Sequence, residues 1–301
     1  MALTAACIPG HYIPRPGLDD AEGPSVPAGI DVVDAHVHLF PPKVMSAIWR
    51  WFDQHAWPVR YRLQSEAVVE FLQARGVTRF CALVYSHKPG LARVLNRFVA
   101  EAARAHPGMI PLGTVLPGEP DARAVVEEAL GPLGLRGIKL HCHVQQMGAD
   151  DPRIDEVYTL CEERGRPVVI HAGREPASPG YGIDVRALCG ADQVDRVLTR
   201  HPRLTLIVPH LGADEFDAYA ALLDRHDNLW LDTTMAVAGY FPAGPSPAVF
   251  PGRAARLLYG TDFPNIPYAW DRELVRILDA VPESPARRAL LAGNALRLFP
   301  D

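Results

Sequence analysis

The stretch Ile30-Asp31-Val32-Val33-Asp34-Ala35-His36-Val37-His38 is a short apolar run that ends in two histidines. Four later apolar runs also end in residues that can bind or activate a metal ion. These are Lys139 in Gly137-Ile138-Lys139-Leu140-His141, His171 after Pro167-Val168-Val169-Ile170, His210 after Leu206-Ile207-Val208-Pro209, and Asp262 in Leu257-Leu258-Tyr259-Gly260-Thr261-Asp262. In a parallel α/β barrel the carboxyl ends of all strands face one mouth, so the pattern predicts a single convergent site.

Apolar, β-branched runs alternate with helix-like stretches along the whole chain. Apolar residues at helical spacing mark 91–106, and Pro or Gly punctuates the stretches 151–164, 184–201 and 214–226. Eight such units with near-continuous apolar strands predict a (β/α)8 TIM barrel. The alternative fold, an open doubly wound sheet, would carry a GxGxxG fingerprint after its first strand, and this chain does not. The predicted strands are 30–38, 78–85, 109–116, 135–142, 167–172, 204–210, 228–233 and 256–262.

Length and composition fit one barrel-sized domain. A chain of 301 residues that is 48% hydrophobic can bury a large single core. Residues 1–28 are rich in Pro and Gly and lack periodicity, so we expect an N-terminal arm followed by one catalytic barrel over 29–301. The five cysteines include no CxxC pair, so neither a disulfide framework nor a thiolate zinc site is indicated.

Charge and hydropathy restrict the partners. A net charge of −5 without a basic block argues against nucleic acid as a partner. No apolar run is long enough to cross a bilayer, and the first residues lack the basic region of a signal peptide. We therefore expect a cytoplasmic protein that acts on a small-molecule substrate. Exposed helical faces of a barrel are also compatible with a homo-oligomer.

The histidines and Asp262 suit a divalent cation. His36 and His38 are two residues apart on a strand, so both imidazoles lie on one side, with Asp34 expected on the same face. Such a pair is a two-pronged ligand for zinc or another divalent ion. His171 and His210 each come just before a glycine that leaves room for a ligand. Asp262 can bind metal and also accept a proton from a metal-activated water.

Lys139 shares one face of its predicted strand with His141 and His143. A buried lysine here can be a carboxylated bridge between two metal ions, a cation that binds substrate, or a neutral base. The structural alternative is an ion pair with an aspartate inside the barrel. We expect His141 and His143 to bind substrate or to support the metal ligands.

Three long connections follow strand carboxyl ends, at 40–65, 173–183 and 235–250. In a barrel these loops build the pocket. We therefore expect Trp57, Arg174 and Tyr240 to contact substrate, although aromatic residues of 40–65 can instead pack a helix onto the barrel. Arginines in these loops are candidates for holding a substrate carboxylate; they are Arg60, Arg62 and Arg174.

The motifs Asp-x-His-x-His, Gly-Ile-Lys-Leu-His, Ile-His-Ala-Gly, Pro-His-Leu-Gly and Gly-Thr-Asp-Phe-Pro together resemble those of the amidohydrolase superfamily. The closest likeness is to its amidohydrolase-related (amidohydrolase 2) branch, which includes aminocarboxymuconate-semialdehyde decarboxylase-like enzymes. The resemblance runs from Ile30 to the C-terminal Gly293-Asn294-Ala295-x-Arg297-Leu298-Phe299. It covers nearly the whole chain and supports the barrel.

The resemblance also implies roles for single residues. His36 and His38 match the first-strand ligands, His171 the fifth-strand ligand, and Asp262 the eighth-strand carboxylate. In mononuclear members His210 stays off the metal and polarises substrate or water. In binuclear members Lys139 bridges two ions, and His171 and His210 hold the second. The branch is commonly mononuclear, so we expect one ion, with zinc favoured.

Two reactions and one non-catalytic role are consistent with these residues. The first is a metal-dependent hydrolase that attacks a C–N or C–O bond of an amide, ester or lactone, with Asp262 and His210 as catalytic residues. The second is a metal-dependent, non-oxidative decarboxylase of a small aromatic or dienoic acid. The third is a barrel that binds a ligand without catalysis. Because every ligand position is filled, the sequence favours an enzyme, and hydrolysis over decarboxylation.

Overall fold

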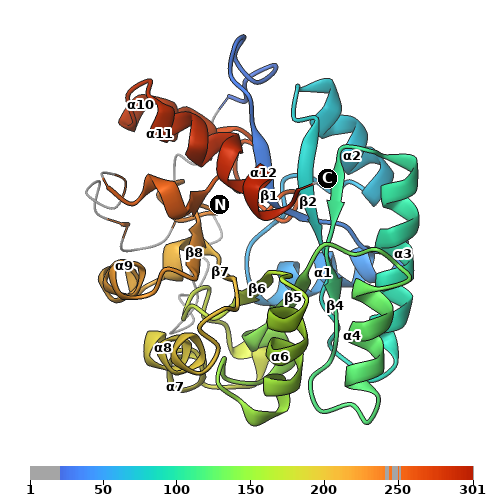
Figure 1. Cartoon of the computed structure of the whole chain (residues 1–301). Coiled ribbons are helices and arrows are strands. Elements are labelled where there is room, and N and C mark those ends of the chain that lie inside the picture. Colours follow the sequence, from blue (N-terminus) through green and yellow to red (C-terminus); the bar gives the residue numbers. More distant parts are fainter. Residues whose placement is uncertain (1–20, 241–243, 246–249, 251, 301) are drawn as a thin grey trace, which may run out of the picture.

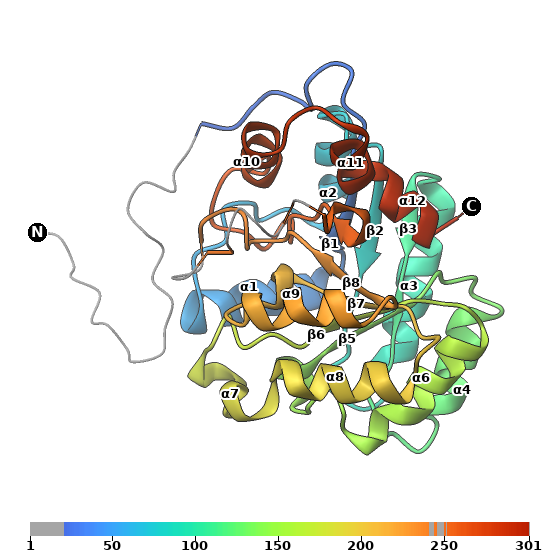
Figure 2. The ribbon, with the colours of Figure 1, turned by 60° about the vertical axis from the view of Figure 1, so that its left-hand side comes forward.

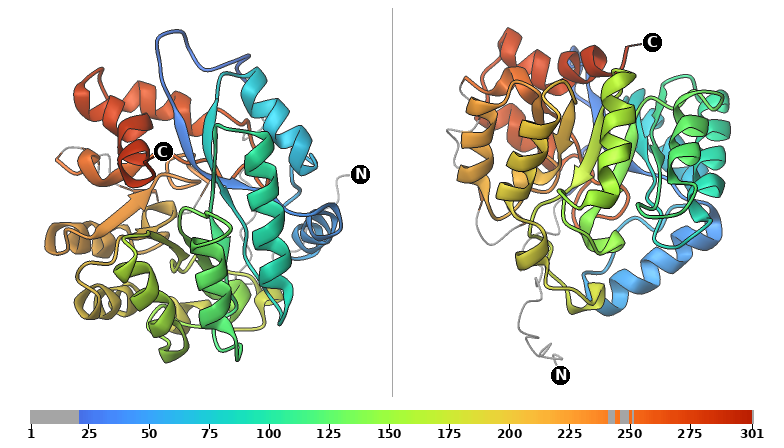
Figure 3. Two further views of the ribbon diagram at one scale, coloured as in Figure 1. Left: turned by 45° about the vertical axis from the view of Figure 1, so that its right-hand side comes forward. Right: turned by 60° about the horizontal axis from the view of Figure 1, so that its bottom comes forward.

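The structure, a computed structural model, describes residues 21–240, 244–245, 250 and 252–300. Its centre is a closed ring of parallel strands surrounded by helices (Figure 1, Figure 3). This confirms the predicted TIM barrel. The strands are β1 Val33–His38, β2 Arg79–Leu83, β3 Met109–Pro111, β4 Gly113–Thr114, β5 Ile138–His141, β6 Val168–His171, β7 Leu206–Val208, β8 Leu229–Asp232 and β9 Leu257–Leu258.

The nine strands in the described part of the chain occupy eight barrel positions because the predicted strand 109–116 is split. Leu112 N still donates to Ala82 O of β2, whereas Gly113 N donates to Gly137 O beside β5. The chain therefore changes partner between β3 and β4. The ring closes between its last and first strands, where Ala35 N donates to Tyr259 O at 2.8 Å.

Helices cover the outside of the ring, and several match the predicted stretches (Figure 2). The stretch 91–106 forms α3, and 214–226 forms α9. The stretch 184–201 is broken by Gly190, whose extended backbone separates α7 from α8. The helices are α1 Pro42–His55, α2 Ser65–Ala74, α3 Leu91–Ala105, α4 Ala122–Leu130, α5 Cys142–Gln145, α6 Asp155–Glu163, α7 Val185–Leu188, α8 Ala191–Arg200, α9 Phe216–Arg225, α10 Arg272–Ala280, α11 Pro285–Arg288 and α12 Asn294–Leu298.

The core has two layers. One lies between the strands and the surrounding helices. The other fills the barrel interior with apolar side chains from most of the strands, and Ala295 and Phe299 at the C-terminus pack against it. Strands β4 and β5 contribute none of these side chains, and in β5 Ile138 and Leu140 belong to the outer layer. Lys139 lies between them and occupies the inward position.

A bulge in β1 sets the direction of the two histidines. Val33 pairs with Arg79 and Asp34 with Phe80, but Val37 pairs with Ala82, so one extra residue sits between Asp34 and Val37. Val33 and Ala35 point into the barrel interior, whereas Val37 belongs to the outer layer. The extra residue therefore lets both Ala35 and His36 point inward. The expectation that Asp34 shares the face of the histidines is wrong, because the bulge separates them.

The described part of the predicted arm lies against the barrel. Glu22 forms an ion pair with Arg75 at 3.1 Å, and Gly23 N donates to Asp271 at 2.8 Å. The boundary between an arm at 1–28 and a domain at 29–301 stays a prediction, since residues 1–20 are outside the described part. Among the described residues, no helix is both long and apolar enough to cross a membrane.

Candidate active site

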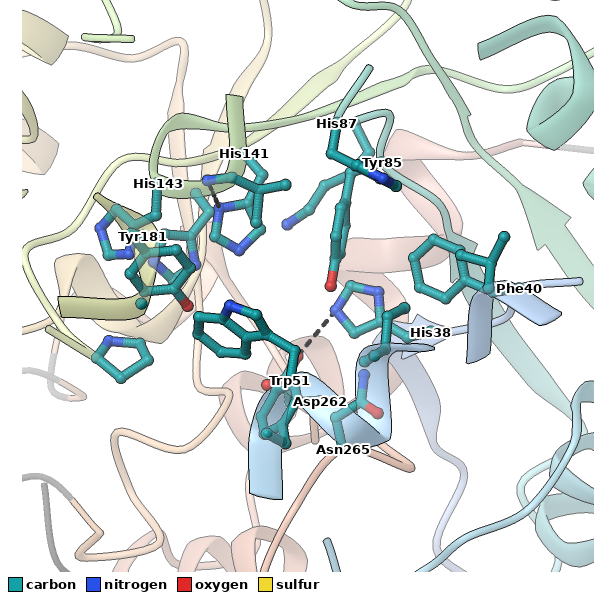
Figure 4. Close-up of a pocket in the computed structure, with 18 of the residues that line it drawn as sticks. His38, Phe40, Trp51, Tyr85, His87, His141, His143, Tyr181, Asp262 and Asn265 are labelled. Atoms are coloured by element: carbon teal, nitrogen blue, oxygen red, sulfur yellow. Dashed lines mark hydrogen bonds and ion pairs between the residues drawn. The ribbon is translucent and has the colours of Figure 1, made fainter. Parts of the chain in front are cut away.

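A cavity of about 460 Å³ opens where the strands end. Its base is made of the predicted metal-binding and ionisable side chains, and aromatic side chains of the loops surround it (Figure 4). The structure thus brings most of the predicted site together. The residues of the base are His36, His38, Lys139, His141, His143, His171, His210 and Asp262.

His36, His38 and Asp262 form the tightest group. One donor atom from each lies within 4.8 Å of the others, the spacing of ligands around one ion. His38 Nε2 is 3.0 Å from Asp262 Oδ1, and His36 Nε2 is 3.4 Å from the same oxygen. All three residues are at most 9% exposed. Two imidazoles and a carboxylate are a donor set that zinc and related divalent ions accept.

The far nitrogens of both imidazoles are held in place. His36 Nδ1 lies 2.8 Å from Asp232 Oδ2, and His38 Nδ1 lies 3.3 Å from the carbonyl oxygen of Leu83. A carboxylate and a carbonyl can only accept, so each Nδ1 carries the proton. Each Nε2 is then free to offer its lone pair to a cation, and the outer partners fix the ring orientation. The residues present therefore fit a metal ion.

His171 and His210 are linked to each other rather than to the tight group. His210 Nδ1 donates to Thr234 O at 3.0 Å, and its Nε2 lies 3.0 Å from His171 Nδ1. Burial lowers the pKa of both imidazoles. A neutral His210 then accepts from His171 Nδ1, which leaves a lone pair on His171 Nε2. That buried nitrogen has no hydrogen-bond partner among the described residues, as expected for a metal ligand.

Backbone strain marks the ends of β7 and β9. His210, Leu211 and Asp262 have φ of 59°, 52° and 68°, values that residues other than glycine rarely adopt. Gly212 is required behind His210, because a Cβ there would lie 1.9 Å from the ring of Tyr219. Such strain is typical of sites where surrounding packing fixes the position of functional groups.

Lys139 is fully buried at the base of the cavity. Its Nζ lies 3.5 Å from His36 Nε2, and among the described residues no carboxylate is within ion-pair distance of it. The described residues therefore do not form the lysine–aspartate ion pair that was the structural alternative for Lys139. Burial lowers the pKa of Lys139 to about 8, and burial next to this ammonium lowers the pKa of His36 to about 4.

His141 and His143 both line the cavity but do not share a strand face. Strand β5 ends at His141, and His143 lies in the short helix α5, which corrects the predicted strand 135–142. His141 stacks on His171 with ring centroids 4.2 Å apart. His143 Nε2 lies 2.8 Å from the carbonyl oxygen of Gly173 and so donates to it. Both positions are compatible with supporting His171 or contacting substrate.

The predicted substrate-binding residues divide into two groups. Trp57 lines the cavity and donates Nε1–H to Asn265 O. Tyr240 lies behind it, with ring centroids 5.2 Å apart, and is not among the cavity-lining residues. Arg174 is also absent from that lining, because its guanidinium pairs with Glu215 at 3.0 Å. Arg174 and Tyr240 therefore lie outside the lining formed by the described residues, and their contact with substrate stays a prediction.

Several site residues were missed by the sequence reasoning. Asp232 ends β8, and it binds His36 and also accepts from the backbone N–H of His210 at 3.0 Å. Its position at a strand end was the available signal. Tyr85 and Tyr181 line the cavity from loops after β2 and β6. No local pattern singled out these two residues.

Replacing Asp232 by alanine is expected to weaken metal binding about 10–100-fold, because it removes the partner that orients His36. Titration against a competing chelator measures this change. Asp195→Ala is the matched control, since Asp195 also binds a histidine, His226, but at the protein surface. Equal metal affinity in the two variants would contradict the role of Asp232.

Glu273 in α10 connects to the site through the segment after β8. It accepts from Tyr268 OH at 2.6 Å and from Met235 N at 3.1 Å. Met235 has a φ of 57° and follows Thr234, whose carbonyl holds His210. Glu273 is fully buried, and burial raises its pKa to about 8.

This raised pKa predicts a pH-dependent stability. The folded protein keeps a proton on Glu273 that the unfolded chain releases above its ordinary pKa of 4.5. The contribution of Glu273 to the free energy of unfolding is therefore complete below pH 4.5. It decreases as the pH rises through 8, by at most about 1.4 kcal/mol per pH unit. Glu273→Gln should remove that slope in urea unfolding at pH 5 and pH 8. Glu66→Gln, on the surface, should not, and an unchanged slope in Glu273→Gln would contradict the assignment.

Comparison with known proteins identifies the family. Residues 33–300 match the Amidohydrolase family. Curated proteins give no match to the chain.

Solved structures share the fold at low identity. 5-Carboxyvanillate decarboxylase LigW from Sphingomonas paucimobilis is 20% identical, with a TM-score of 0.64 over 90% of this chain and 99% of that chain. 2,6-Dihydroxybenzoate decarboxylase from Rhizobium is 15% identical, with a TM-score of 0.64 over 90% and 98%. A putative 2-pyrone-4,6-dicarboxylic acid hydrolase from Pseudomonas putida is 18% identical, with a TM-score of 0.63 over 90% and 97%.

The family match covers nearly the whole barrel, and the donor set at its mouth fits a divalent cation. Both agree with the resemblance that the sequence motifs gave. The chain belongs to the amidohydrolase family and is a metal-dependent enzyme, a hydrolase or a carboxy-lyase, that acts on a small molecule.

Proposed function

We propose that the protein is a metal-dependent, non-oxidative decarboxylase of a small aromatic carboxylic acid. The observation that carries this proposal is the cavity, in which a metal-type donor set and Lys139 lie beneath an aromatic wall. A planar ring fits such a wall while its carboxylate reaches the polar base. The sequence alone favoured hydrolysis. Two of the three structural neighbours described above are decarboxylases, and they support the alternative better.

We assign the metal to His36, His38 and Asp262, with His171 Nε2 as the fourth ligand. When bound, the cation would hold a substrate oxygen and draw electron density from the reacting bond. These donors suit zinc, with manganese as an alternative because it also accepts carboxylate ligands. One ion is proposed because the described residues contain one group of three clustered donors.

Decarboxylation breaks the bond between the ring carbon and the carboxylate and releases CO2. The electron pair stays on the ring carbon, which takes up one proton. Asp262 is the carboxyl group that lines the cavity, so we assign this transfer to it: Asp262 takes a proton from a water molecule and passes it to the ring carbon, and the hydroxide that remains combines with CO2 as bicarbonate. The Lys139 ammonium at the base would pair with an anionic oxygen of the substrate. His210, bonded to His171, is assigned to orienting that ligand, a change from the catalytic role that the sequence suggested.

Hydrolysis is the second candidate, and the same carboxylate favours it. Burial would raise the pKa of Asp262, but its close contacts with His38 and His36 outweigh burial and keep that pKa below its usual range. An ionised Asp262 can take a proton from an attacking water. One neighbour is named as a putative hydrolase.

Isotope labelling distinguishes the two reactions. Metal-loaded protein is incubated with a panel of hydroxybenzoic acids, and separately with aromatic lactones and amides, in D2O and in H2¹⁸O. Decarboxylation predicts release of CO2 and one deuterium at the vacated ring position. Hydrolysis predicts ¹⁸O in the product and no CO2. A result with ¹⁸O uptake and no CO2 from any acid would overturn the decarboxylase proposal.

A further inference from the structure

The charged side chains around the cavity are confined to its base. Among the lining residues that the structure describes, Lys139 and Asp262 are the charged ones besides histidines, and no arginine or glutamate is present. A substrate therefore meets positive charge only where Lys139 and the proposed metal lie.

The three arginines of the mouth loops are held elsewhere. Arg62 forms an ion pair with Asp53, Arg60 lies 3.7 Å from Glu22, and Arg174 pairs with Glu215. None of the three lines the cavity. The loop 235–250, part of which lies outside the described residues, contains no charged residue in its sequence.

The upper wall is apolar and aromatic. Helix α1 contributes Ala47, Ile48, Trp51 and Phe52 to the lining, and the ring of Trp51 packs against that of Tyr181 with ring centroids 4.7 Å apart (Figure 4). His87 is the one imidazole of the lining that lies outside the base. Burial and the adjacent Lys88 lower its pKa, so it is neutral at pH 7.

We propose that the substrate carries a single anionic group, bound at the base, and an uncharged apolar substituent that packs against α1. This inference rests on the proposed function and names its substrate class as aromatic monocarboxylic acids. A second carboxylate at the far end would be buried against Ile48 and Trp51 without a partner, which is strongly unfavourable. An apolar group there gains affinity, about fourfold for each buried methylene.

Equilibrium binding to the metal-loaded protein tests the inference without relying on turnover. The probes are salicylate, 5-isopropylsalicylate and 5-carboxysalicylate, the last two of which have ring substituents of nearly the same shape. Isothermal titration calorimetry should show the isopropyl compound binding at least tenfold more tightly than the carboxy compound, with salicylate between them. Equal or tighter binding of the carboxy compound, or no binding of any probe, would overturn the inference.

A cation placed on the wall should reverse this preference. Ile48→Arg is expected to strengthen binding of 5-carboxysalicylate at least tenfold and to weaken that of the isopropyl compound. Ala47→Arg, at an already exposed lining position, repeats the test if Ile48→Arg fails to fold. Gln54→Arg adds the same charge to the exposed side of α1 and should change neither affinity. A reversed preference between the two compounds in Gln54→Arg would contradict the proposed apolar wall. An unchanged preference in all three variants would contradict it as well.

The outcomes of this test and of the isotope experiment are separable. The expected order of affinities without CO2 release would leave the specificity standing and remove the decarboxylase. Release of CO2 from dicarboxylic acids alone would support the decarboxylase and contradict the proposed substrate specificity.

Discussion

Replacing Asp262 by asparagine is expected to lower turnover about a thousandfold or more while the barrel stays folded. Asparagine has nearly the same shape and tolerates the φ of 68° at this position. It keeps the backbone hydrogen bond from residue 262 to His36 O. It cannot carry the proton that either candidate reaction moves, and proton transfer of this kind contributes about 10²–10⁴-fold to a rate.

Initial rates with the best substrate of the panel measure this effect, and circular dichroism checks the fold. Asp271→Asn is the control, because Asp271 is also largely buried but binds Gly23 N away from the cavity. Near-normal turnover in Asp262→Asn would eliminate Asp262 as the group that moves the proton.

Replacing His36 or His38 by alanine is expected to reduce the bound metal from about one ion per chain to less than about a tenth. Each change removes one of three clustered donors, and His36→Ala also removes the imidazole that binds Oδ2 of the fully buried Asp232. The metal should bind the folded protein and not the unfolded chain. At a thousand times its Kd it contributes about 4 kcal/mol to stability, so both variants should also lose the rise in Tm that added metal gives.

Elemental analysis of protein purified without chelator measures the metal content. His106→Ala is the control, because His106 pairs with the exposed Glu66 at the surface and should leave the content unchanged. About two ions per chain in the unaltered protein would instead support a pair bridged by a carboxylated Lys139. Full metal content in both alanine variants would refute the assigned ligands.

The barrel could be predicted because its signals are local. Apolar runs, their bounding Gly and Pro residues and the helical spacing of 91–106 depend on neighbours in sequence. The predictions failed where distant contacts decide the structure. The strand 109–116 divides at Leu112 because its two halves hydrogen-bond to different neighbours, which no local pattern shows.

The same distinction applies to the site. His36, His38 and Asp262 were predicted because they end apolar strands. Asp232 acts through His36, 196 residues away in sequence, and its role became visible only when the two were close in space. Arg174 lay in the right loop, but Glu215 from another loop holds it. Charge neutralisation between distant segments decides whether a mouth arginine is available to substrate.

Because β1 contains an extra residue, the metal site depends on which face of the strand each side chain occupies as well as on residue type. With regular alternation from Val33, the side chains of 36 and 38 would point outward to the helices, on the side where Val37 now packs. Forcing β1 into regular alternation without changing its number of residues would therefore keep every histidine in the chain and still dismantle the site. The same Asp-x-His-x-His motif, transplanted to an unbulged barrel strand with its aspartate facing outward as Asp34 does, would bury its imidazoles among aliphatic side chains.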